Sequence, residues 1–547
     1  MTRGQNTSRS SRKLGDLLSE AGVSVPAKFR DLAIAGIVTD SRQVVSGQLF
    51  VALGGGLVDG HDFLASAVAK GAVALVVEQA AKVPPGLADA VAVVVVADSR
   101  AALSPLAAAF FGQPQKELRL FGITGTNGKT TTSYLLESII RAAGGEPGVI
   151  GTVNYRFRGR EYPGAFTTPE PLTIFGLMRE MVDSGVTHLV MEVSSHGLAL
   201  GRVAGLFFDL AMFTNLSRDH LDFHGDMKEY FAAKESLFTA HLKESGAALV
   251  MLRESEDVED WGGRLLAELT ATGRFRLNPG AGQLGKRASG GIPLLTCGRE
   301  RGELQSRRAE LSLAGITTEL ALPDGTQLEL TSPLIGDFNL ENLLVAVGGG
   351  WLAGFSPAQL AAGVAAMRRV PGRMERVAVP VGGRPVQVFV DYAHTPDALA
   401  RVLATVRRLS RGRLVVVFGC GGDRDRGKRP LMGEAAGRLA DVVLITSDNP
   451  RSEEPGAIMA GIESGLYPGG QGLMARGRAE WLLIGGGRGY DLIESRRQAI
   501  RLAVRHARPD DVVVLAGKGH EDYQLIGGKK FHFDDCQEAA LEMQVVG

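Results

Sequence analysis

The chain has 547 residues, which is enough for three or four domains with separate hydrophobic cores. Hydrophobic residues make up 45% and charged residues 22% of it, as is typical of a globular protein. Lysine plus arginine and aspartate plus glutamate number 60 each, so the net charge is zero and does not favour nucleic acid or a membrane surface as the main partner. The three cysteines are too few and too widely spaced for a disulfide framework or a CxxC metal site.

The N-terminus and the cysteine usage together predict a cytoplasmic protein. The first residues, MTRGQNTSRSSRKLGDLL, are basic and rich in serine and have no apolar core region, unlike a signal peptide. No apolar run reaches the length of a membrane span. We therefore expect a soluble monomer that acts on small molecules, with no nucleic-acid or membrane partner.

Short apolar runs recur along the chain, and each is followed by a glycine-rich or polar turn and then by an amphipathic stretch. Runs that are apolar at every position predict strands buried on both faces, and helices between them predict parallel α/β sheets. The clearest runs lie at 118–125, 187–195, 210–217, 413–422, 441–449 and 511–519. Ligands bind at the carboxyl ends of such strands, and the polar motifs of this chain directly follow the runs.

The pattern divides the chain into three α/β domains, each with a mainly parallel or mixed sheet flanked by helices. We place them at 1–115, 116–370 and 371–547. The central domain is expected to be similar to a P-loop ATPase, and the last to a Rossmann fold. Two glycine-rich stretches, 279–302 and 466–490, predict surface loops without chemistry.

The most informative motif is GITGTNGKTT at 122–131, between a predicted strand and a predicted helix. Its glycines let backbone amides converge on phosphate oxygens, and the helix N-terminus adds partial positive charge. Lys129 would neutralise the β- and γ-phosphates, and Thr130 would reach Mg²⁺. The motif departs from GxxxxGK[ST] because position 123 is isoleucine, so an ordinary glycine-rich turn is the alternative interpretation.

Three further polar residues lie in stretches that suit phosphate and metal chemistry. Glu192 ends a predicted strand in MEVSSHGL, and Mg²⁺ prefers oxygen ligands of this kind. His220 lies in NLSRDHLDFHG, and Lys234 lies on a predicted helix in YFAAKESLF. Taken alone, each also fits a structural role: a surface carboxylate, a capping or core histidine, and a solvated helix lysine.

GTNGKTT, followed by these segments in this order, resembles the Mur ligase family. Its members use ATP to phosphorylate a carboxylate and then let an amine attack the acyl phosphate. The resemblance implies that Thr130, Glu192, His220 and Lys234 bind Mg²⁺, with Lys234 carbamylated to N6-carboxylysine, and that Lys129, His220 and Lys234 are catalytic. It implies ATP binding by Gly125, Thr126, Asn127, Gly128, Lys129, Thr130, Thr131, Asn339, Asn342, Asp391 and His394.

Two arginine-bearing loops follow strands late in the chain, GGDRDRGKRPLM at 421–432 and DNPRSEEP at 448–455. Arginine can bind a carboxylate with both arms of its guanidinium, although a salt-bridged surface loop explains either motif alone. With GKGHE at 517–521, they resemble the amino-acid pocket of the family members that add diaminopimelate. The resemblance implies diaminopimelate contacts from Arg424, Asp448, Asn449, Pro450, Arg451, Gly517 and Glu521.

The first block resembles the uridine-nucleotide domain of the same family. The resemblance implies contacts to UDP-MurNAc-dipeptide from Ser41, Gly56, Leu57, Val58, Thr167, Thr168, Ser194 and Arg202. Leu200 stands where relatives carry a polar glutamine, so one hydrogen bond to the substrate would be missing or moved.

The function implied is an ATP- and Mg²⁺-dependent ligase of peptidoglycan precursor synthesis. It would add meso-diaminopimelate to UDP-MurNAc-L-Ala-D-Glu through an acyl phosphate. A lysine-adding ligase of the same family is the first alternative. A folylpolyglutamate synthase would have no reason to keep the block 1–115, and a P-loop ATPase without ligase activity would explain residues 125–130 but not the order of the later motifs.

Overall fold

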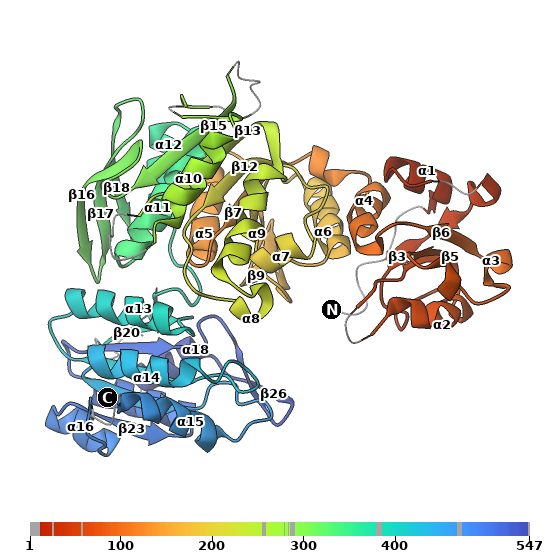
Figure 1. Cartoon of the computed structure of the whole chain (residues 1–547). Coiled ribbons are helices and arrows are strands. Elements are labelled where there is room, and N and C mark those ends of the chain that lie inside the picture. Colours follow the sequence, from red (N-terminus) through yellow and green to blue (C-terminus); the bar gives the residue numbers. More distant parts are fainter. Residues whose placement is uncertain are drawn as a thin grey trace. The chain divides into compact units, whose positions relative to one another are not determined.

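The computed structural model describes residues 11–24, 27–55, 58–253, 259–277, 279–282, 284, 290–378, 386–467 and 473–544. The chain divides into two compact units. The first unit comprises Met1–Arg307, Leu320–Leu328 and Glu341–Ala366, and the second comprises Arg308–Glu319, Glu329–Leu340 and Met367–Gly547. Each unit is built on parallel strands with helices packed on them (Figure 1), so the α/β class predicted from the apolar runs is confirmed.

The N-terminal part of the first unit holds a parallel sheet of order β3-β4-β5-β6. Along β4, Leu49 and Val51 enter one hydrophobic cluster while Phe50 enters another, so both faces of the sheet are covered. This explains why its strands are apolar at every position except Gln48. The elements are β1 (Arg12–Lys13), α1 (Leu14–Glu20), β2 (Ala33–Ile34), β3 (Gly36–Val38), β4 (Gln48–Val51), α2 (Leu64–Ala69), β5 (Ala72–Val77), α3 (Leu87–Ala90), β6 (Ala92–Val95) and α4 (Ser99–Phe110).

The larger sheet of the first unit runs in the order β10-β9-β8-β11-β7-β12-β13-β15. It is parallel from β8 through β15, and β9 and β10 are added antiparallel at one end. These strands are β7 (Arg119–Thr124), β8 (Pro147–Ile150), β9 (Asn154–Phe157), β10 (Arg160–Pro163), β11 (His188–Glu192), β12 (Phe208–Phe213), β13 (Leu242–Met251) and β15 (Ile292–Gly298). The short strand β14 (Phe275–Arg276) pairs with β15, and β16 (Leu304–Ser312), β17 (Gly315–Ala321) and β18 (Gln327–Ser332) have residues in both units. Because β7 lies between β11 and β12, the loops that follow these three strands leave the same edge of the sheet.

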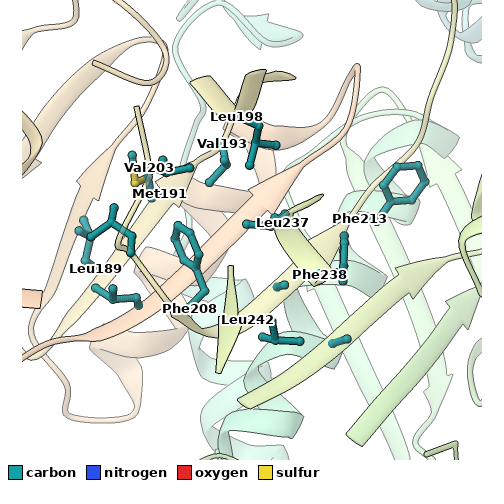
Figure 2. Close-up of a cluster of buried hydrophobic side chains, with 14 of the residues drawn as sticks. Leu189, Met191, Val193, Leu198, Val203, Phe208, Phe213, Leu237, Phe238 and Leu242 are labelled. Atoms are coloured by element: carbon teal, nitrogen blue, oxygen red, sulfur yellow. The ribbon is translucent and has the colours of Figure 1, made fainter. Parts of the chain in front are cut away.

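The helices that follow these strands carry several of the predicted nucleotide-side residues, among them Lys129, Thr130 and Thr131 on α5 (Lys129–Ala142). The other helices are α6 (Pro171–Asp183), α7 (Ser195–Ala199), α8 (Leu221–His224), α9 (Met227–Thr239), α10 (Trp261–Ala271), α11 (Asp337–Ala353) and α12 (Pro357–Ala366). Figure 2 shows how α9 is fixed: Leu237 and Phe238 join Phe208 and Phe213 of β12 in one buried cluster. The position of α9, and so of Lys234 on it, therefore depends on the core beneath the sheet edge.

The expectation of surface loops at 279–302 is wrong for part of that stretch. Residues 292–298 form β15, which is buried along its length and pairs in parallel with β13. The second stretch, 466–490, contains the helix α16 (Ala479–Gly485) and the first residues of β23 (Gly489–Ile493). Glycine content indicated turns, but the apolar run IPLLTC within the first stretch forms a strand because it fills the sheet. Parts of both stretches lie outside the described residues.

The second unit is built on a sheet of order β19-β20-β24-β21-β22-β23, parallel except at β19. Val416 and Phe418 of β21 face one cluster and Val415 and Val417 the other, so this sheet is also buried on both faces. The elements are β19 (Glu375–Arg376), β20 (Gln387–Asp391), α13 (Pro396–Leu409), β21 (Leu414–Phe418), α14 (Lys428–Leu439), β22 (Val442–Thr446), α15 (Pro455–Glu463), α16, β23, α17 (Arg496–His506), β24 (Val512–Ala516), β25 (Tyr523–Ile526), β26 (Lys529–His532) and α18 (Asp535–Gln544). Across the described ranges, no helix combines the length and the apolar character needed to cross a membrane.

One buried ion pair joins α17 to α18, and it yields a stability prediction. Arg496 Nε and Nη2 lie 2.7 and 2.5 Å from the carboxylate of Asp535, and both side chains are fully buried. Arg496→Met should lower the free energy of unfolding by about 3–5 kcal/mol, because it leaves Asp535 as an uncompensated buried charge. The neighbouring Arg497 forms a similar pair with Glu538 but is largely exposed, so Arg497→Met should cost only about 0–1 kcal/mol. Denaturant unfolding of the full chain measures both, and equal losses would contradict the argument.

Candidate functional site

The phosphate loop predicted from GTNGKTT connects β7 to α5. The strand ends at Thr124 and the helix begins at Lys129, so the predicted helix N-terminus is confirmed. Gly128 caps the helix with a φ of 87°, and Gly125 has a φ of 145°. A Cβ atom at Gly125 would come within 2.0 Å of Thr214 Oγ1, and one at Gly128 within 2.2 Å of Asn342 Oδ1. Both the backbone angle and the space therefore require glycine.

The segment after β12 holds this loop in place. Thr214 Oγ1 donates to the carbonyl of Asn127 at 2.6 Å, and the Asn127 amide donates to Asn215 Oδ1 at 2.9 Å. Thr126 Oγ1 hydrogen-bonds Tyr230 Oη of α9 at 3.0 Å. These partners lie about ninety to one hundred residues away in sequence. Thr214 and Asn215 were not identified from the sequence, and the available signal was their position as polar residues near the end of the run 210–217.

Lys129 and Lys234 converge on this loop. Lys129 Nζ donates to the carbonyls of Gly125 and Thr126 at 2.7 and 2.8 Å. Lys234, on α9, is almost fully buried, and its Nζ donates to the same Gly125 carbonyl at 2.9 Å. Burial, reinforced by the charge of Lys129, lowers the pKa of Lys234 well below its usual value. A lysine with a lowered pKa has a larger fraction of neutral amine, which is the form that reacts with CO₂.

Thr130 and Glu192, the first two predicted metal ligands, lie together. Thr130 Oγ1 donates to Glu192 Oε2 at 3.0 Å, and both side chains are buried. Thr152 also donates to Glu192, from its hydroxyl at 2.8 Å and from its amide at 3.2 Å. Thr152 was missed because it follows β8, whose turn contains no recognised motif.

His220 lies near the two lysines. It is the N-cap residue of α8, in a left-handed conformation with a φ of 54°. The centroids of its ring and the His196 ring are 4.8 Å apart. Burial lowers the pKa of His220 to about 4, and the charges of Lys129 and Lys234 act in the same direction. A neutral imidazole is the form that binds a metal ion.

This donor set can be tested for its fit to Mg²⁺. Within the ranges that the structure describes, no three histidine, cysteine, aspartate or glutamate side chains are grouped to hold a metal. A hydroxyl and a carboxylate 3.0 Å apart nevertheless supply the oxygen ligands that Mg²⁺ prefers, and Mg²⁺ commonly retains waters and substrate phosphates as further ligands. A carbamate on Lys234 would add another oxygen donor. The residues present therefore fit a magnesium site.

The predicted muramyl-peptide residues Thr168, Ser194 and Arg202 form one network beside Glu192. Thr168 Oγ1 donates to the Glu192 carbonyl at 2.9 Å and accepts from the Ser194 amide and hydroxyl. Arg202 Nη1 donates to the Thr168 carbonyl at 3.0 Å and pairs with Glu170.

The remaining substrate-side predictions are placed less closely together. Thr167 Oγ1 lies 3.0 Å from Thr152 Oγ1, and Leu200 is half-buried at the end of α7. Ser41 is buried and its carbonyl accepts from Lys70, whereas the side chain of Val58 is exposed. Gly56 and Leu57 lie outside the described residues.

In the second unit, the predicted amino-acid residues gather at one edge of the sheet. The loops after β21, β22 and β24 leave adjacent parallel strands. Arg451 has a φ of 54°, and its Nη1 donates to the Gly422 carbonyl at 2.7 Å. A Cβ atom at Gly422 would come within 1.9 Å of the Pro450 carbonyl, so glycine is needed for the two loops to meet.

Asn449 connects these loops to the turn after β24. Its Nδ2 donates to Glu521 Oε2 at 2.8 Å, and its Oδ1 accepts from the Leu525 amide at 2.9 Å. Burial and the charge of Asp448 raise the pKa of Glu521. Gly517, with a φ of 107°, would place a Cβ atom 2.8 Å from Asp448 Oδ2. Arg424 is exposed on the neighbouring loop, and the fully buried Lys518 was missed although it lies inside the quoted motif GKGHE.

The remaining predicted nucleotide-side residues are Asp391, His394, Asn339 and Asn342. Asp391 is buried and accepts from the Met374 and Ala393 amides at 2.7 and 2.8 Å, and burial raises its pKa. His394 Nδ1 lies 2.8 Å from the Tyr392 carbonyl. Asn339 Nδ2 donates to the Ile335 carbonyl at 2.8 Å, whereas Asn342 belongs to the first unit, beside Gly128. Their contact with a nucleotide stays a prediction.

The phosphate loop, the two lysines that converge on it and the arginine-bearing edge of the second sheet are typical of a nucleotide-dependent ligase. Comparison with known proteins agrees. Three family descriptions match: "Mur ligase family, catalytic domain" at 33–111, "Mur ligase middle domain" at 123–349 and "Mur ligase, glutamate ligase domain" at 372–519. A relative from Geobacter metallireducens, named UDP-N-acetylmuramoyl-L-alanyl-D-glutamate--2,6-diaminopimelate ligase, is 45% identical over 95% of each chain. The chain belongs to the Mur ligase family.

Solved structures agree with this assignment. A structure with the same name as that relative is 32% identical, with a TM-score of 0.65, over 98% of this chain and 99% of the other. A MurF ligase from Thermotoga maritima in complex with ADP, at 18% identity and a TM-score of 0.56 over 93% and 96% of the two chains, shares the fold.

The two ends of α5 offer a matched test of the phosphate loop. Gly128→Ala should weaken ATP binding by roughly a hundredfold or more, because the new methyl group displaces Asn342 and the loop must leave its left-handed conformation. Gly144, beyond the other end of α5, has a similar φ of 83° but no atom within 4 Å of its Cβ position. Gly144→Ala should therefore cost only about 1 kcal/mol of stability and leave binding unchanged. Isothermal titration with ATP distinguishes the two, and normal binding by Gly128→Ala would contradict the loop assignment.

Proposed function

We propose that this protein joins 2,6-diaminopimelate, as the meso isomer, to UDP-MurNAc-L-Ala-D-Glu at the expense of ATP. The observation that carries the proposal is the extent of similarity to the relative of that name, because it spans 95% of both chains. Mg²⁺ as cofactor, a cytoplasmic location and a monomeric state are part of the proposal. The domain boundaries 1–115, 116–370 and 371–547 are also part of the proposal. Each matched family segment falls inside one of these three domains.

The proposed reaction begins with attack of the free substrate carboxylate on the γ-phosphorus of ATP. The bond between this phosphorus and the β–γ bridging oxygen breaks, ADP leaves, and an acyl phosphate forms. The amides of residues 125–131 would bind the phosphates, and Lys129 would exchange its loop carbonyls for phosphate oxygens. When bound, Mg²⁺ would neutralise phosphate charge, held by Thr130, Glu192, His220 and the carbamate of Lys234.

The second step joins the amino acid. A neutral amine of diaminopimelate attacks the acyl carbon, inorganic phosphate leaves, and the nitrogen loses a proton to give the amide. The protein contributes mainly by holding the two reactants in place. Thr167, Thr168, Ser194 and Arg202 would hold the muramyl peptide, with Ser41 and residues 56–58 at the uridine end. Arg424, residues 448–451, Gly517 and Glu521 would hold diaminopimelate.

A direct assay separates this proposal from its alternatives. ADP release from UDP-MurNAc-L-Ala-D-Glu should depend on added diaminopimelate and should be much weaker with lysine. Preference for lysine would indicate the lysine-adding ligase, turnover of folates a folylpolyglutamate synthase, and ADP release independent of any amino acid an ATPase.

The carbamate can be tested on α9. Lys234→Ala should lose most ligase activity, because it removes the anion expected beside the metal. Short-chain carboxylates that fill the vacated space should restore part of that activity. Lys228 is exposed on the same helix, so Lys228→Ala is the control and should retain wild-type activity. A fully active Lys234→Ala variant would refute the carbamate.

Arg451 should decide recognition of the far carboxylate of diaminopimelate. Arg451→Ala should raise the KM for diaminopimelate roughly tenfold to a hundredfold, since a hydrogen bond to a charged group is worth about 1.5–3 kcal/mol, and should leave the KM for ATP nearly unchanged. Arg426 lies on the neighbouring loop and pairs with Glu453 while largely exposed, so Arg426→Ala serves as the control. Steady-state kinetics with each substrate varied in turn measures the difference. A similar rise in both KM values would count against a specific contact.

A further inference from the structure

Lys518 is a buried cation at the centre of the amino-acid edge. Its side chain has no exposed surface. Its Nζ lies 3.5 Å from Asp448 Oδ1, 3.4 Å from Glu521 Oε2 and 3.4 Å from Asn449 Oδ1. All three partners are residues that the proposed function assigns to diaminopimelate.

The three distances show that the ammonium is shared. Strong charge-assisted hydrogen bonds measure about 2.7–2.9 Å, and each contact of Lys518 is longer. Asn449 already accepts a hydrogen bond from the Leu525 amide and donates one to Glu521, so its position is set independently of Lys518. Lys518 therefore compensates the two acidic side chains together and does not form a closed pair with either one.

The formal charges of Asp448, Glu521, Lys518 and Arg451, none of which is exposed, add to zero, whereas Arg424 is exposed on the neighbouring loop. Asp448 and Glu521 contribute two negative charges, and Lys518 and Arg451 contribute two positive ones. Burial and the charge of Asp448 raise the pKa of Glu521, while Lys518 lowers it, so the lysine favours the ionised form of Glu521. Arg496 of α17 is not counted because it forms a buried ion pair with Asp535. The centroid of the Tyr523 ring lies 5.5 Å from Lys518 Nζ.

We propose that Lys518 is a specificity-determining residue, which offsets one acidic charge so that the edge accepts a zwitterionic group and disfavours a lone ammonium. The inference rests on the proposed function and extends it to a residue outside the expected contacts. The far end of diaminopimelate carries an ammonium and a carboxylate and is neutral overall. The far end of lysine carries only the ammonium, so at a neutral edge it leaves one positive charge unbalanced.

The net charge of the edge can be varied in single steps. Lys518→Met makes it −1, wild type and the double variant Lys518→Met/Glu521→Gln are both 0, and Glu521→Gln makes it +1. The quantity to measure is kcat/KM for diaminopimelate divided by kcat/KM for lysine. Both substrates have the far ammonium, so damage to the fold or to the ammonium contact lowers both terms and leaves their ratio unchanged.

The ratio should follow the charge. It should fall roughly tenfold or more in Lys518→Met, stay within about threefold of wild type in the double variant, and rise in Glu521→Gln. Arg413→Met is the matched control. Arg413 is a mostly buried cation of the same unit, paired with Asp511 at 2.6 Å, and its loss should leave the ratio unchanged.

The outcomes separate this inference from the proposed function. If wild type turns over diaminopimelate and the ratio is the same in all variants, only the inference is overturned. A wild-type protein without diaminopimelate-dependent ADP release would overturn the proposed function and the inference with it. If Lys518→Met does not fold, the double variant and Glu521→Gln still differ by one charge. A ratio roughly tenfold higher in Glu521→Gln supports the inference, and equal ratios overturn it.

Discussion

Two lysine side chains donate to one carbonyl oxygen, that of Gly125, and the nucleotide side of the first unit depends on this arrangement. Lys129 reaches the oxygen from the start of α5 and Lys234 from the middle of α9, at 2.7 and 2.9 Å. Bringing two ammonium groups together in a buried place is unfavourable, and the lowered pKa of Lys234 reflects it. A polyanionic ligand, or conversion of one lysine to an anion, would relieve the repulsion, which supports the proposal that this loop binds phosphate.

The order of strands makes this convergence possible. In register, Glu192 of β11 lies opposite Ile123 of β7, and Phe213 of β12 lies opposite Thr124. The residues that follow these strands are therefore neighbours, although they are far apart in sequence. The buried cluster of Figure 2 then fixes α9 against β12 and so sets the depth of Lys234.

The second unit uses the same kind of sheet edge with a different charge balance. Its loops bring Asp448 and Glu521 together around Lys518, and Arg451 sits on the backbone of the neighbouring loop. Whereas the loop at 125–131 gathers the two lysines Lys129 and Lys234, the side chains of this edge that are not exposed carry balanced charges. The contrast suits a phosphate on one and an amino acid with both charges on the other.

Much of the local structure could be predicted from the sequence. Continuous apolar runs indicated strands buried on both faces, and GKTT after a strand indicated a helix N-terminus near Lys129, because these features depend on neighbouring residues. Periodicity also placed Lys234 on a helix. Tertiary structure alone decided which distant side chains meet. Thr152 joins Glu192, Lys518 lies between Asp448 and Glu521, and the run at 292–298 became a buried strand because it completes a sheet. Such contacts depend on strand order and register, which bring together residues seventy positions apart, as for Lys518 and Asp448, and no local pattern encodes them.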